Sequence, residues 1–184
     1  MNLIINKTNF IKCIYNIEEK DIGKEIQIIN NKYYYKGKEK KNDEIKKKII
    51  IMINGEEIKS LNYKFNKEGK YNVYLIEKKP IINISGMFSE CKFLEYLNLS
   101  SFKTDKVTNM SGMFYGCTSL NELNLSSFKT DQVTDMSGMF WGCSSLKELN
   151  LSSFKTDKLN DMSKMFSGCS SLNELNYHHL KQIK

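Results

Sequence analysis

The chain has 184 residues, 40% of them hydrophobic, so it is long enough to bury a core and too apolar for a disordered chain. Its formal net charge of +7 comes from one half: residues 1–83 hold 18 Lys against 11 acidic residues, while residues 84–184 hold 10 of each. The sequence contains no Arg, the residue best suited to bind phosphates and guanines through paired hydrogen bonds, so we do not expect a nucleic-acid partner.

The N-terminal stretch MNLIINKTNFIKCIYNIEEKD has no uninterrupted apolar run behind a basic start and no small-residue cleavage pattern. No run in the chain approaches the ~20 apolar residues that a membrane span requires. We therefore expect a cytoplasmic protein without a membrane span. A cell-surface or secreted protein is the alternative if the N-terminus has been trimmed.

Residues 1–80 carry no repeat and are rich in β-branched and aromatic residues. The pair Asn54-Gly55 separates two apolar runs and predicts a tight hairpin, since both central positions of that turn need a positive φ. The lysine-rich stretch 36–48 is interpreted as a solvated connection. We predict a small all-β domain of five or six strands that ends near Pro80, with strands at 10–17, 25–30, 47–54, 58–65 and 70–77.

Residues 81–184 are built from a repeat of 26 residues that never loses its register. The units are 84–109, 110–135, 136–161 and a shortened 162–184. A fixed period of this length is typical of repeat architectures whose units stack. Four positions show the period most clearly: Met87, Met113, Met139 and Met165; Phe88, Phe114, Phe140 and Phe166; Cys91, Cys117, Cys143 and Cys169; Leu97, Leu123, Leu149 and Leu175.

Within one unit the apolar spacing changes. Met110, Met113, Phe114 and Cys117 fall at i, i+3, i+4 and i+7, which predicts one face of a short helix. Leucines at 123 and 125 then alternate with polar residues, which predicts a strand. The predicted fold class is thus α+β: an all-β domain over 1–80, and over 81–184 a right-handed leucine-rich-repeat-like solenoid of four 26-residue coils, each with a short helix and a short parallel strand.

The stretch VTNMSGMFYGCTSLNELNLSSFKTD resembles the BspA-like leucine-rich repeats, found in surface proteins of bacteria and in protists. Their pattern, roughly V-T-x-M-x-x-M-F-x-x-C-x-x-L-x-x-L-x-L-S-x-F-x-T, is met by residues 107–130 and 133–156 almost throughout, and the resemblance covers about residues 84–177. It implies a curved solenoid used for adhesion or protein binding, without enzymatic activity.

Stacked units leave an apolar surface at each end that must be covered. We expect residues 71–76 to lie close to the first repeat strand and shield it. At the other end Tyr177, His178 and His179 replace Leu, Ser and Ser, which we interpret as a polar C-terminal cap. A poor cap would favour a homo-oligomer formed through the ends of the solenoid.

No catalytic, cofactor or metal site is predicted. The four repeated cysteines lie on the apolar face of the predicted helix and are interpreted as free, buried thiols, and the absence of C-x-x-C argues against zinc. The acidic rows, Asp105, Asp131 and Asp157, and Asp135 and Asp161, are assigned to turn formation, with calcium as the alternative. The two adjacent histidines lack a third ligand, and no nucleophile and base or phosphate-binding loop is visible.

The outward positions of the repeat strands are the candidate partner-binding residues. They form a first row of Tyr96, Glu122, Glu148 and Glu174 and a second row of Asn98, Asn124, Asn150 and Asn176. Stacked glutamates repel, so the first row must be well solvated or matched by a cationic partner. Tyr115 and Trp141 are either contact anchors or packed ladder residues. We expect a non-enzymatic protein-protein interaction module; the alternatives are a self-assembling structural protein and a surface adhesin.

Overall fold

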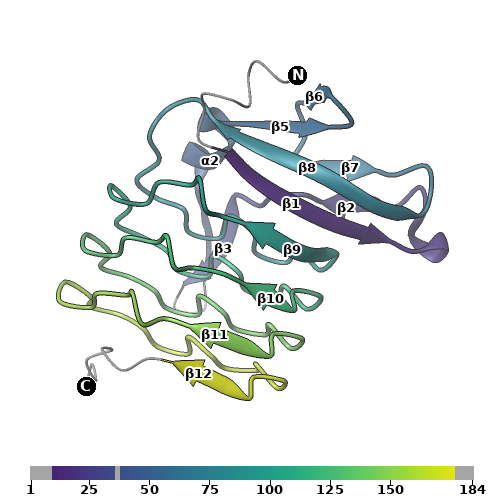
Figure 1. The fold of residues 1–184 in the computed structure, drawn as a ribbon. Helices are drawn as coiled ribbons and strands as arrows, with labels where there is room; N and C mark the ends of the chain where they lie inside the picture. Colours follow the sequence, from purple (N-terminus) through teal and green to yellow (C-terminus); the bar gives the residue numbers. More distant parts are fainter. Residues whose placement is uncertain (1–9, 36–37, 177–184) are drawn as a thin grey trace.

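The structure, a computed structural model, describes residues 10–35 and 38–176 (Figure 1). The first part of the chain forms eight strands, one α-helix and one 3-10 turn. They are β1 (Phe10–Ile17), η1 (Glu19–Asp21), β2 (Glu25–Gln27), β3 (Lys32–Tyr35), β4 (Lys38–Lys41), α2 (Asp43–Lys48), β5 (Ile49–Ile53), β6 (Glu56–Ile58), β7 (Asn62–Lys64) and β8 (Gly69–Glu77). The repeats contribute β9 (Leu94–Asn98), β10 (Glu122–Leu123), β11 (Glu148–Asn150) and β12 (Glu174–Asn176).

The main sheet has six strands in the order β10-β9-β1-β8-β5-β6, so it joins the first part of the chain to the repeats. The strand predicted at 10–17 is confirmed as β1, in which alternate residues are buried as a strand with one covered face requires. The predicted hairpin is also confirmed: Asn54 and Gly55 have φ values of 52° and 88° and connect the antiparallel strands β5 and β6.

Two local predictions for the first part of the chain are wrong. The stretch 36–48 is not a plain connection, because its described residues form β4 and α2. Asn42 makes the helix start here, since its side chain accepts a hydrogen bond from the amide of Glu44. The predicted strand 58–65 is divided into the end of β6 and β7, so the count of five or six strands was too low.

The repeat units lie one above another (Figure 1), and we call residues 84–176 the repeat stack. Strands β9 and β10 pair in parallel, as do β11 and β12. The phenylalanine rings form a continuous column that is buried except at its last ring, with centroids 5.7 Å apart between Phe88 and Phe114, 5.7 Å between Phe114 and Phe140, and 5.8 Å between Phe140 and Phe166. The repeated Met, Phe and Cys positions of units 1–3 are fully buried, as predicted.

The predicted helix in each coil is absent. Residues 110–116 form turns, because Gly112 and Gly116 have φ values of 58° and 69°, which a right-handed helix does not allow. Alternate amides also donate outside the unit: Gly112 N–H to the carbonyl of Ser137 at 2.8 Å, and Gly116 N–H to that of Trp141 at 2.7 Å. The spacing i, i+3, i+4, i+7 therefore marks buried positions on successive turns.

The predicted fold class is consequently wrong. The chain is mostly β, with α2 as the one α-helix among residues 10–35 and 38–176, and its sheets do not curl into the right-handed solenoid of helix-bearing coils that we expected. The repeats contribute short parallel strands and hydrogen-bonded turns instead. The buried residues of both predicted segments, 1–80 and 81–184, form one continuous hydrophobic core.

The strand that covers the first repeat strand is β1, and not residues 71–76 as predicted. β1 pairs antiparallel with β9 on one side and with β8 on the other, so β8 lies one strand further away. Side chains complete the cover: the hydroxyl of Tyr15 donates to the carbonyl of Ile28, and the thiol of Cys91 donates to the same carbonyl at 3.4 Å. The predicted C-terminal cap, Tyr177 to His179, lies outside the described residues.

The first unit is also closed by amide groups from the first part of the chain. In units 2 to 4 the carbonyls at four positions accept amides from the unit before, but unit 1 has no such neighbour. At the first unit, the carbonyls in the four equivalent positions are those of Asn83, Ser85, Met87 and Ser89. They accept from Asn42 Nδ2 at 2.9 Å (Asn83) and 3.3 Å (Ser85), from the Asn30 backbone amide at 2.8 Å (Met87), and from Asn30 Nδ2 at 3.0 Å and Gln27 Nε2 (Ser89). We call Gln27, Asn30 and Asn42 the amide cap.

Candidate functional site

The outward side chains of the repeat strands line an open groove of ≈ 770 Å³. In each strand a leucine is turned into the core while the residues before and after it face outward, as the alternation predicts. Seven of the ten predicted partner-binding residues lie along the groove: Tyr96, Glu122, Asn124, Glu148, Asn150, Glu174 and Asn176. Six of them are exposed, and Tyr96 is half-buried.

The groove lies where the strand pairing of the stack is interrupted. β10 and β11 belong to separate sheets, whereas β9 pairs with β10 and β11 with β12. Below this point the strands are joined by backbone bonds such as Leu151 N–H to the carbonyl of Asn176 at 2.8 Å. Residues from both sides of the interruption, 121–126 and 147–153, contribute to the groove wall. The groove thus spans the interruption between these two units.

The groove carries net negative charge, with three glutamates against Lys147. Glu148 and Glu174 are paired in register on neighbouring strands, and Glu122 occupies the same position on β10. Over the described ranges, no lysine amine lies within 4.0 Å of these three carboxylates, although other acidic residues, such as Glu90 and Glu95, do form ion pairs. The three carboxylates therefore remain available to cationic groups from solvent or from a partner.

The asparagine row has a structural role besides its exposure. In the first three members the Oδ1 atom accepts the backbone amide of the serine two residues later, at 3.0 Å for Asn98, 2.9 Å for Asn124 and 2.9 Å for Asn150. Such side-chain turns end the strand and start the next turn. The oxygen atoms of these three asparagines are therefore already engaged within the chain, and Asn98 does not line the groove.

Tyr115 and Trp141 form a pair of their own and do not line the groove. Their ring centroids are 5.4 Å apart in an edge-to-face arrangement, and both residues are half-buried. The amine of Lys164 lies 5.0 Å from the Trp141 ring centroid, which is close enough for a cation–π contact. The structure thus brings these two aromatics together as packed neighbours and separates them from the glutamate row.

The cysteines are free, and the thiols at 117, 143 and 169 each donate to a carbonyl of the preceding unit. Cys117 donates to Phe88, Cys143 to Phe114 and Cys169 to Phe140, at 3.0–3.1 Å. Burial raises the pKa of the Cys117 thiol well above its ordinary value and that of Cys91 to about 12. Protonated thiols of this kind are hydrogen-bond donors and poor nucleophiles.

The acidic rows also act within the fold. Asp135 Oδ1 accepts from the backbone amide of Ser137 at 2.8 Å and from its hydroxyl at 2.7 Å, which is the turn chemistry predicted for this row. Asp131 is paired with Lys155 at 2.6 Å, and the hydrogen bond from that amine lowers the pKa of the Asp131 carboxyl. In the part of the chain that the structure describes, no three His, Cys, Asp or Glu side chains are grouped as metal ligands. His178 and His179 lie outside the described residues.

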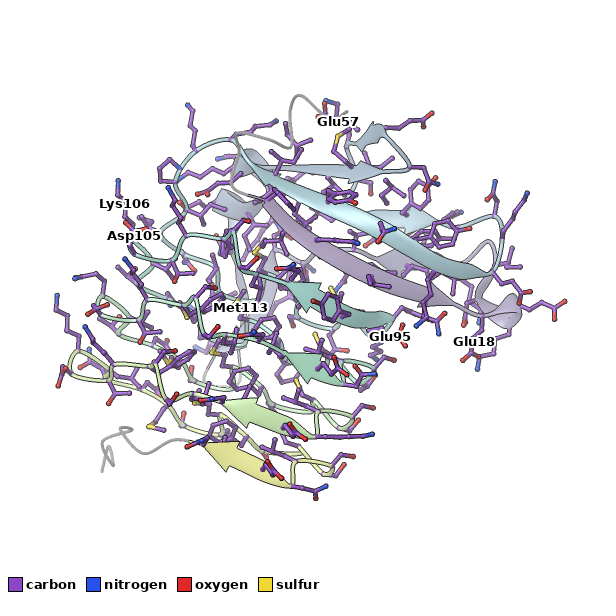
Figure 2. The ribbon with its side chains drawn as sticks, in the orientation of Figure 1. Glu18, Glu57, Glu95, Asp105, Lys106 and Met113 are labelled. Carbon is purple, nitrogen blue, oxygen red and sulfur yellow. The ribbon has the colours of Figure 1, made fainter. Side chains whose placement is uncertain are left out.

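A second groove, of ≈ 600 Å³, continues from the first toward the side of the stack where Glu18 and Glu95 lie (Figure 2). Asn121 and Lys147 line both grooves, so the two surfaces are contiguous. Asp105 and Lys106 project from turns at the opposite side of the stack, and Met113 is enclosed within it (Figure 2). Sequence reasoning missed Lys147, and strand alternation offers no signal for it, because Lys147 precedes β11 and directly neighbours the outward Glu148.

The family model described as "Mycoplasma protein of unknown function, DUF285" matches residues 32–121 and 82–182. Together these matches span more than half of the chain, so the chain belongs to this family. No curated protein and no solved structure matches it. Among residues 10–35 and 38–176, no helix is both long and apolar enough to cross a membrane.

Proposed function

We propose that this member of the DUF285 family is a non-enzymatic protein-interaction module, and that it binds its partner along the groove on the outward face of β9 to β12. The observation that carries the proposal is the groove itself. It gathers three unpaired carboxylates and the exposed polar side chains of neighbouring units into one concave surface of ≈ 770 Å³. The resemblance to BspA-like repeats, whose members serve in adhesion and protein binding, points to the same class of function.

The charge of the groove favours a cationic partner. Glu122, Glu148 and Glu174 are held at equivalent positions on stacked units, so a partner that places lysine or arginine against them relieves their mutual repulsion. Tyr96 at the upper end of the row adds an aromatic surface of the kind that is enriched at binding interfaces. The glutamate row and Tyr96 together favour a partner that is positively charged and extended.

The side chains of the groove suit binding better than catalysis. Among the described residues, the lining consists of Glu, Asn, Ser, Tyr and Leu from the repeats, with Lys147 as its one basic residue. Within the part of the chain that the structure describes, burial raises the pKa most strongly for buried thiols and for the buried Tyr15. These residues line neither groove. A site for general acid–base chemistry would normally combine perturbed groups with a pocket.

Charge reversal tests the proposal. We expect Glu122→Lys combined with Glu148→Lys to abolish capture of the partner proteins that the unmodified chain retains from extracts of its native source. Asp105→Lys is the matched control, because it reverses an exposed charge on the same stack outside the groove. Capture must persist in that control. Equal capture by all three chains, at equal thermal stability, would contradict the assignment of the groove.

A further inference from the structure

The last described unit, residues 162–176, presents backbone donors at its outer edge. In units 1 to 3, four alternate amides of the turn segment each donate to a carbonyl of the following unit, at 2.6–3.0 Å. Within residues 10–35 and 38–176, no carbonyl accepts from the equivalent amides of this unit. These amides, which we call the donor edge, belong to Met162, Lys164, Phe166 and Gly168.

The apolar residues behind the donor edge are only partly covered. Phe166 stacks on Phe140 through one face, and it is half-buried whereas Phe140 is fully buried. The same difference separates most other apolar residues of this unit from their equivalents in the one before it, although Met165 stays buried. The partly buried residues packed at this end of the core are Met162, Phe166, Cys169, Leu172 and Leu175. A covering element would therefore gain apolar contact as well as hydrogen bonds.

A second copy of this chain does not fit the donor edge. The complementary carbonyls at the other end of the stack are already bonded to the amide cap, Gln27, Asn30 and Asn42. Two donor edges facing each other would place amides against amides, which leaves every donor unsatisfied. An element that binds the donor edge must supply carbonyl acceptors, and those carbonyls must not already be bonded to a cap.

We propose that the donor edge docks an extended segment of another protein that carries the same 26-residue repeat. The donor edge continues the stack, because it repeats an interface that the chain makes three times internally. The donors, the ring column and the spacing are the same. Such a segment offers alternate carbonyls in register with the four amides and a phenylalanine that stacks on Phe166. The binding mode extends the existing ladder by one more unit.

The test uses a labelled synthetic peptide with the sequence of residues 135–161, which contains all four acceptor carbonyls, and the full-length chain under reducing conditions. We expect saturable binding by fluorescence anisotropy. Phe166→Asp in the chain should weaken binding by about tenfold or more, since it removes the stacking surface. Met162→Lys is a second, independent lesion at the same edge, and a peptide carrying Phe140→Ala is the matched ligand control. Circular dichroism establishes that the variants remain folded.

Each outcome decides the proposal. Glu148→Lys should leave peptide binding unchanged, because it alters the groove and not the donor edge, so this assay is separate from the test of the proposed function. Absence of saturable binding, or equal binding by the two edge variants and the unmodified chain, overturns the proposal. Self-association of the chain that Phe166→Asp abolishes would also overturn it, since the occupant would then be a second copy.

Discussion

Replacing Asn42 by Asp isolates the contribution of one donor in the amide cap. Asn42 is buried; its Nδ2 atom donates to the carbonyls of Asn83 and Ser85, while its Oδ1 atom accepts the amide of Glu44 at the start of α2. The Asp variant keeps the shape and the acceptor but loses the donor. It also places a carboxylate against two carbonyl oxygens. Because the acceptor at the start of α2 is kept, the loss of stability in this variant reports on closure of the first unit alone.

The magnitude follows from the contacts that are lost. Leaving a buried polar group without its partner costs about 1–3 kcal/mol, and the facing charge adds to this, so we expect Asn42→Asp to lower the free energy of unfolding by about 2–3 kcal/mol at pH 7. For a chain of this length that corresponds to a fall in Tm of about 4–12 °C. Asn42→Ala should cost about 2–4 kcal/mol, because it also removes the helix cap.

Thermal unfolding followed by circular dichroism between pH 7 and pH 4 is the assay. The introduced carboxyl is buried and faces carbonyls, so its pKa in the folded state is raised above the ordinary value of about 3.9. The penalty is therefore present above the folded pKa and disappears as the pH falls through it. Asn124→Asp, at an exposed turn, is the control, with a loss below about 0.5 kcal/mol. An Asn42→Asp chain that unfolds at the Tm of the unmodified chain at pH 7 would refute the reasoning.

Three further predictions concern the interior of the stack. Phe114→Ala should lower the free energy of unfolding by about 3–5 kcal/mol, since the ring is fully buried between two others, while Phe166→Ala should cost less than half of that; urea unfolding measures both. Gly142→Ala should cost about 1–2 kcal/mol for its φ of 75°, without a clash, because a Cβ there comes no closer than 3.6 Å to Gly116; a loss above about 4 kcal/mol in urea would contradict this. Iodoacetamide at pH 8 should alkylate the half-buried Cys169 before the fully buried thiol at 117, as peptide mass mapping would show.

The 26-residue period predicts which residues of the repeats are buried, but it does not predict their backbone. Met110, Met113, Phe114 and Cys117 are buried as expected, and the helix inferred from their spacing is absent. Consecutive hydrogen-bonded turns and a short helix place apolar residues at similar intervals. The glycines at two fixed positions in units 2 and 3, and at one of the two in units 1 and 4, were the available signal, because a residue with positive φ interrupts a helix.

The arrangement of the first part of the chain depends on contacts distant in sequence. Residues 10–17 and 70–77 are both apolar and β-rich, so local pattern cannot decide which of them lies beside the first repeat strand. The structure selects β1, which places Tyr15 and Cys91 in contact with the carbonyl of Ile28. Pairings of this kind are settled by how whole elements fit, which a single sequence does not record.

The candidate site was predicted in part. Strand alternation was sufficient to place the glutamate row on the outer face, because alternation fixes which side of a strand a residue occupies. The interruption between β10 and β11, which the groove spans, left no trace in the near-identical sequences of the two units. For Tyr115 and Trp141 the sequence leaves two alternatives, contact anchors or packed ladder residues, and the structure shows the two rings in contact with each other.

The regularity of the inter-unit bonds has a consequence for how such a chain can change in length. Units 1 to 3 each give their amides to the next unit, and units 2 to 4 each receive the same bonds from the one before, so inner units are interchangeable within the stack. A tandem copy or a loss of whole 26-codon blocks would make the molecule taller or shorter and leave both of its ends intact. A block of 25 or 27 codons would misalign every donor that follows it.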